Sequence, residues 1–88
     1  MKIIGREKLD AIKGKREDID RWISIWLTEL RQNKWFSQDD LKKDYPRAKT
    51  TATTFNFPVP ESGYIIKVSF HFDQSIALIS AVSVGKNP

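Results

Sequence analysis

Two side chains in the second half of the chain, His71 and Lys67, are of the types that carry out chemistry on phosphate esters. An imidazole can exchange a proton near neutral pH, and an ammonium group can stabilise negative charge on a phosphate. Four residues apart on one strand, the two side chains share a face and could both reach one phosphate. The alternative is a solvated strand face with incidental polar residues. His71 and Lys67 are therefore the candidate catalytic residues.

A second candidate site is a group of basic residues around Pro46, namely Lys42, Lys43, Arg47 and Lys49. Such a group can bind the phosphates of a nucleic acid, or it can be ordinary solvated surface charge. The net charge of +4 lies entirely in residues 1–50, which contain 13 Lys and Arg and 9 Asp and Glu. Residues 51–88 have no net charge. A basic surface favours an anionic partner such as RNA, although it is also common in soluble domains.

Other residue types give weaker signals. With one His, no Cys and scattered carboxylates, no metal site or disulfide framework is predicted, and no cofactor is implied. Trp22 and Trp26 lie one helical turn apart and could stack on bases, but their alignment with other apolar residues favours core packing. Ile25 lies off that stripe and is a candidate partner-facing residue.

The elements that must position these residues begin with helices. Ile3 and Ile4 predict a short edge strand, and residues 6–13 predict one or two helical turns with Leu9 and Ile12 facing inward. Residues 17–33 predict a long amphipathic helix, whose apolar stripe is Ile19, Trp22, Ile23, Trp26, Leu27 and Leu30. Ser37 is the expected N-cap of a short helix that ends near Tyr45, because Pro46 cannot continue it.

The second half predicts strands. Residues 50–57 are rich in strand-forming types, residues 58–63 form a loop, and residues 64–73 alternate between apolar and polar. A short turn at 73–75 leads into a strand at 76–84, which makes an antiparallel hairpin; the residues expected to share one of its faces are Ile76, Leu78, Val82 and Val84. The chain is predicted to be one α+β domain, in which N-terminal helices pack on one face of a mainly antiparallel sheet of three or four strands. The expected core includes Trp22, Trp26, Leu30, Val68, Phe70 and Leu78.

Length and composition agree with one domain. The chain has 88 residues, of which 40% are hydrophobic. This is enough for a packed core that needs no disulfide bonds or structural metal. No apolar run approaches the roughly 18 residues of a membrane span, and the start of the chain has no apolar leader segment. A cytoplasmic protein with no membrane partner is the expectation.

The predicted order β-α-α-β-β-β resembles that of the RelE-like toxins of type II toxin–antitoxin systems. The segment from Trp35 to Ala48, with its Leu41-Lys42 pair and its Tyr45-Pro46-Arg47-Ala48 turn, looks most like the HigB family. The Phe55-Asn56 pair before a hairpin also fits that family.

This resemblance implies a metal-independent endoribonuclease that cleaves mRNA on the ribosome and is silenced by a cognate antitoxin. It also implies that the sheet face without helices faces the RNA. The Arg that such sequences share falls near Ile65, beside Lys67, and their His-x-x-Tyr motif falls on residues 85–88, which lack His and Tyr. Lys86 is the basic residue there and joins the candidate RNA-binding residues. A catalytically silent RelE-like fold that binds protein or RNA, as an inhibitor or decoy, is the alternative, and a generic RNA-binding domain is the third.

Overall fold

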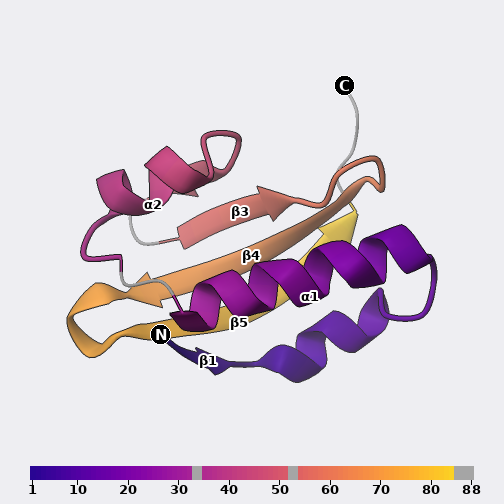
Figure 1. The fold of residues 1–88 in the computed structure, drawn as a ribbon, viewed down its shortest axis with the longest axis horizontal. Coiled ribbons are helices and arrows are strands. Elements are labelled where there is room, and N and C mark those ends of the chain that lie inside the picture. The colour runs from indigo at the N-terminus through magenta and orange to yellow at the C-terminus, as the bar shows by residue number, and fades with distance from the viewer. Residues whose placement is uncertain (33–34, 52–53, 85–88) are drawn as a thin grey trace.

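A five-stranded sheet with its helices gathered on one side organises the chain (Figure 1). The structure is a computed structural model and describes residues 1–32, 35–51 and 54–84. Its elements, in chain order, are β1 (Lys2–Ile4), the 3-10 helix η1 (Arg6–Ala11), α1 (Glu17–Gln32), α2 (Gln38–Asp44), β2 (Lys49–Thr51), β3 (Thr54–Pro58), β4 (Tyr64–His71), the 3-10 helix η2 (Phe72–Gln74) and β5 (Ile76–Val84).

The sheet is mixed, with the strand order β1-β5-β4-β3-β2. β1 runs parallel to β5, and all the other neighbours are antiparallel. The α+β class and the helix-covered face are as predicted, but the sheet has five strands rather than three or four. The prediction was wrong in number because residues 49–51 form a separate strand beside β3, in a region where the sequence shows one continuous run of strand-forming residues.

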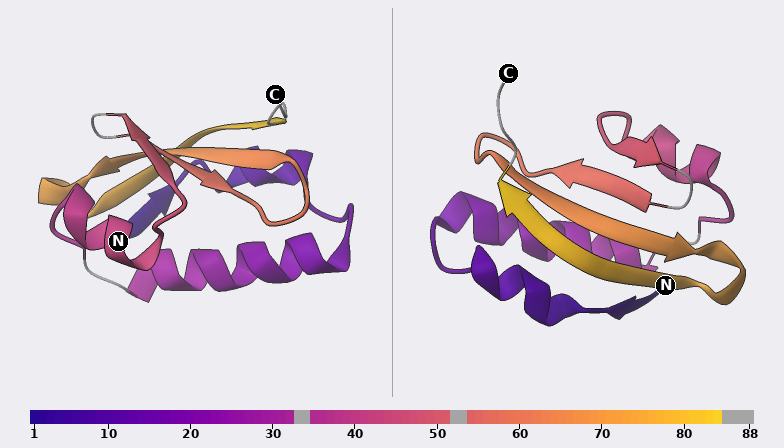
Figure 2. Two further views of the ribbon diagram at one scale, coloured as in Figure 1. Left: turned by 90° about the horizontal axis from the view of Figure 1, so that it is seen from above. Right: turned by 180° about the vertical axis from the view of Figure 1, so that it is seen from behind.

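The helix α1 lies against one face of the sheet, and none of the described helices covers the opposite face (Figure 2). α1 forms because its apolar residues recur every three or four positions, with acidic residues in its first turn and Arg31 in its last. Its buried residues are Ile19, Ile23, Trp26, Leu27 and Leu30. Trp22 was expected in the same core but is only partly buried, at the edge of this stripe.

The core between α1 and the sheet is rich in aromatic rings. Trp26, which is 1% exposed, meets Phe57 edge to face at 5.3 Å between ring centroids. Phe55 and Phe70 are fully enclosed and meet in the same way at 5.3 Å. Val68 and Leu30 are also buried, as predicted. These contacts join one helix to the two central antiparallel strands and fix which face of the sheet is inside.

A β-bulge in β5 changes which of its residues face the core. Lys67 pairs with Ala81, but the next residue, Val68, pairs with Ile79, so β5 has one residue more than β4 there. The extra residue reverses the alternation. Ile76 and Leu78 therefore lie on the face away from α1, whereas Val82 and Val84 lie on the other. The prediction that these four residues share a face was wrong, and so was the burial of Leu78, which is only partly covered.

The connections at the N-terminal half follow from local chemistry. Gly5 joins β1 to η1 with a φ of 88°, and a Cβ at this position would lie 2.3 Å from the carbonyl oxygen of Ile79, so only glycine fits. Leu9 and Ile12 point into the core from η1 and its end, as predicted. Ser37 caps α2 by accepting a hydrogen bond from the amide of Asp40.

Within the described ranges, no helix is both long and apolar enough to cross a membrane.

Candidate functional site

The face of the sheet opposite α1, here called the open face, holds three of the candidate residues, Lys49, Lys67 and His71. Directly paired residues in a sheet point to the same side, so the strand register assigns its members. They are Lys2 and Ile4 on β1, Lys49 on β2, Thr54, Asn56 and Pro58 on β3, Ile65, Lys67, Ser69 and His71 on β4, and Ile76, Leu78, Ala81 and Ser83 on β5. The open face is therefore polar over β2–β4 and more apolar over β5 and β1.

One row across the open face joins residues from three strands. Lys49 pairs with Asn56, and Asn56 pairs with Lys67. Neighbouring strands lie about 4.8 Å apart, so the backbones of Lys49 and Lys67 are roughly 10 Å apart. Both lysine side chains are exposed, and the Asn56 amide between them can donate and accept hydrogen bonds. These three residues are here called the Lys-Asn-Lys row.

The strands contribute no opposing charge to this row. Among the residues within the five strand bounds, none is Asp or Glu, while Lys2, Lys49, Lys67 and His71 are all there. The chain's carboxylates lie instead in helices, turns and loops. A surface of one sign raises the local concentration of ligands of the opposite sign. The open face is therefore suited to an anion that extends over several strands.

His71 and Lys67 lie on the open face and are both exposed, as the alternation of β4 predicted. Ser69 stands between them, and four residues of strand separate their Cα atoms by roughly 13 Å. Across the described ranges, no hydrogen bond orients either side chain. The two residues share a surface that an RNA strand could cover, but they do not form a preassembled acid–base pair. The geometry supports binding more directly than it supports catalysis.

The basic group around Pro46 is divided by the structure. Arg47 and Lys49 line a cavity of about 200 Å³ together with Asn56, Pro58 and Ile65, at the β2 end of the Lys-Asn-Lys row. Lys42 and Lys43 are exposed on α2, beyond the edge of the sheet, and line none of the cavities described here. Lys86 lies outside the described residues. The structure thus brings Arg47, Lys49 and Lys67 together and leaves the α2 lysines apart.

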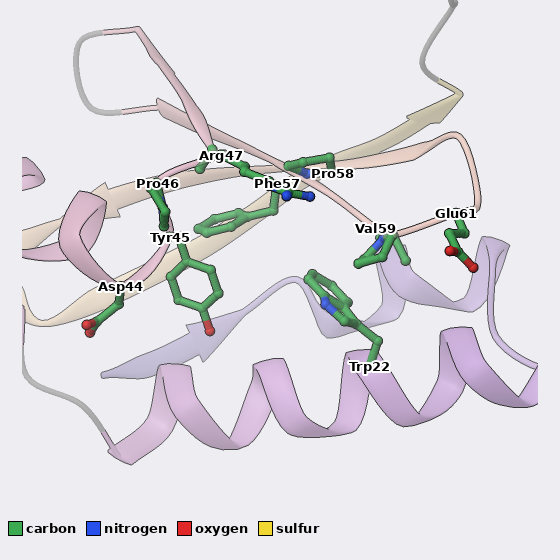
Figure 3. A pocket seen from close by; sticks show the side chains of 11 residues that line it. Trp22, Asp44, Tyr45, Pro46, Arg47, Phe57, Pro58, Val59 and Glu61 are labelled. Atoms are coloured by element: carbon green, nitrogen blue, oxygen red, sulfur yellow. The ribbon is translucent and has the colours of Figure 1, made fainter.

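A larger cavity of about 540 Å³, here called the aromatic pocket, lies on the other side of Arg47 (Figure 3). It opens between α1, the turn after α2 and the loop at residues 59–63, and its principal walls are Trp22, Tyr45, Phe57 and Val59. Arg16 at the start of α1 donates a hydrogen bond of 2.9 Å to the backbone oxygen of Glu61, which ties the loop to the helix. This pocket was not predicted from the sequence, because its walls come from three separate segments of the chain.

Tyr45 carries a polar group at the back of the aromatic pocket. Its hydroxyl oxygen is buried and lies near the carboxylate of Glu29 on α1. Burial raises the pKa of the Tyr45 hydroxyl, and the negative charge of the Glu29 carboxylate raises it further. The hydroxyl is therefore protonated at neutral pH, and it is enclosed by the protein rather than open to the pocket.

Comparisons with known proteins leave the family of this chain unassigned. No protein-family model matches its sequence, and the curated proteins include no significant match. No cluster of three or more His, Cys, Asp or Glu suited to a metal ion occurs within residues 1–32, 35–51 and 54–84. The resemblance to the HigB family accordingly stays a prediction.

Proposed function

We propose that the open face binds single-stranded RNA and that the chain is a RelE-like RNA-binding domain. The observation that carries this proposal is the Lys49-Asn56-Lys67 row, in which both lysines are exposed and Asn56 is partly exposed, on strands that contain no carboxylate. Lysine side chains bind phosphates and fix the position of a nucleic acid, whereas an amide side chain can contact base edges. Arg47, at the end of the row, extends the basic surface beyond β2.

The shape of this surface favours a single strand over a duplex. The cationic groups are spread over a broad sheet face, and none of them projects on a helix that could enter a groove of B-form DNA. Proteins that bind single strands combine a basic track for the backbone with aromatic rings for the bases. The open face supplies such a track from His71 to Arg47, and the aromatic pocket adjoins it.

A second candidate function is the one that the resemblance implies, a toxin that cleaves mRNA on the ribosome and is held inactive by an antitoxin. The specific observation in its favour is that His71 is exposed on the same face as Lys67. His71 would move the proton during attack by the 2′-hydroxyl, and Lys67 would stabilise the charge on the phosphate. In the alternative, a catalytically silent fold, the same face binds RNA without cutting it. Neither His71 nor Lys67 then has to be held in an orientation suited to proton transfer.

The proposal predicts that replacing both Lys49 and Lys67 with alanine weakens binding to a short single-stranded RNA and reduces its salt dependence. Each lost phosphate contact should lower the slope of log affinity against log salt by roughly 0.7. The measurement is fluorescence anisotropy with a labelled oligonucleotide over a series of salt concentrations.

The matched control replaces Lys8 and Lys15, which are exposed on η1 and in the turn before α1, away from the open face. This double variant loses the same charge and should keep the slope of the parent. An equal loss of affinity and slope in both double variants would mean that only net charge matters, which would contradict a site on the open face.

A further inference from the structure

We propose that the aromatic pocket holds one base of the RNA strand whose phosphates lie on the open face. This inference rests on the proposed function and deepens it, because it turns a basic surface into a site that also contacts a base. It depends on two observations, namely the partly uncovered ring of Trp22 and the residues that the two cavities share.

The rings around the pocket are fixed by one another and leave Trp22 partly uncovered. Trp22 stacks on Trp26 with 5.8 Å between ring centroids and an interplanar angle of 14°. Tyr45 meets Phe57 edge to face at 5.2 Å. Figure 3 shows Trp22 rising from α1 on one side of the pocket and Tyr45 entering from the turn after α2 on the other. A flat molecule against the uncovered part of the Trp22 ring would extend the Trp22–Trp26 stack, and every nucleobase offers such a flat face.

The aromatic pocket and the smaller cavity share two lining residues, Arg47 and Pro58. A strand that places a phosphate against Arg47 and Lys49 therefore has its next base at the mouth of the aromatic pocket. Two carboxylates, Asp44 and Glu61, also line that pocket and would repel a phosphate. Asp44 is held by a 2.8 Å hydrogen bond from the indole of Trp35. The charges thus assign the phosphates to the open face and the base to the pocket.

The test compares a short oligoadenylate with an abasic oligomer of the same length and backbone. The parent protein should bind the oligoadenylate more tightly, and its tryptophan fluorescence should change on binding. Trp22→Leu should weaken oligoadenylate binding about 5- to 150-fold, as expected for the loss of one base stack, while binding of the abasic oligomer stays unchanged. Phe36→Leu is the matched control, because Phe36 is 77% exposed and lines neither cavity.

Tyr45→Phe is a second variant that preserves the ring, because it removes only a hydroxyl that is buried near Glu29. It should bind both oligomers as the parent does, since the hydroxyl does not reach a molecule in the pocket. Equal binding of the two oligomers by the parent, or a Trp22→Leu variant that binds as the parent does, would overturn the base pocket and leave the open face standing. If the parent binds neither oligomer, the proposed function and this inference both fail.

Discussion

Replacing Trp26 with alanine should lower the free energy of unfolding by about 3–5 kcal/mol, the cost typical of removing an enclosed aromatic side chain. Trp26 is 1% exposed and contacts both Trp22 on its own helix and Phe57 on β3. Its loss would open a cavity between α1 and the sheet that neighbouring rings cannot fill without leaving their own contacts. Chemical denaturation followed by circular dichroism measures the change.

The control for this prediction lies one residue earlier on the same helix. Ile25 is 56% exposed on the side of α1 away from the sheet, so Ile25→Ala should change the free energy of unfolding by less than about 0.5 kcal/mol. A Trp26→Ala variant as stable as the Ile25→Ala variant would show that α1 does not pack on the sheet as described. The described core would then be wrong, and with it the assignment of the open face.

If the chain cleaves RNA, His71→Ala should reduce cleavage by about 10²- to 10⁴-fold, the usual contribution of a general acid–base group. Binding of RNA should change little, because the Lys49-Asn56-Lys67 row is untouched. In cells that express the parent without an antitoxin, growth should stop and translated mRNAs should be cut. Growth curves and primer-extension mapping of cut sites compare the parent with the variant.

Growth curves and cut-site mapping test the role of His71 and the toxin function separately. A His71→Ala variant that arrests growth and cuts mRNA as the parent does would remove His71 from the mechanism. Normal growth and intact transcripts in cells with abundant parent protein would argue against the toxin and favour the silent RNA-binding fold. Lys42→Ala with Lys43→Ala should affect neither result, because these two residues lie apart from the open face on α2.

The parts of the fold that the sequence predicted well are those set by local periodicity. The stripe of α1 and the alternation of β4 each bury one side of a single element, so the residues themselves define the inward face. The β-bulge at Ser80 could not be predicted in this way. It depends on how β5 pairs with β4, and both Ser80 and its neighbours are compatible with an unbroken strand.

The candidate site was predictable to a similar extent. The side of β4 on which Lys67 and His71 lie follows from alternation, but the approach of Lys49 to Lys67 requires the register of β3 between them. Asn56 could have been assigned to the open face, since Phe55 and Phe57 on either side of it are apolar. The aromatic pocket could not have been predicted, because Trp22 and Tyr45 come close to each other only in the folded chain. Neither segment indicates this proximity by itself.

Binding of single-stranded RNA to the open face can be followed residue by residue by mapping amide chemical shifts during titration with a short oligoadenylate. The largest changes should occur at Lys49, Asn56 and Lys67 and at their neighbours on β2, β3 and β4. Ile25, which is exposed on the outward side of α1, should show almost none, because it faces neither the sheet nor the aromatic pocket. Changes confined to α1 and η1, with the amides of these three strands unaffected, would show that the RNA does not bind the open face.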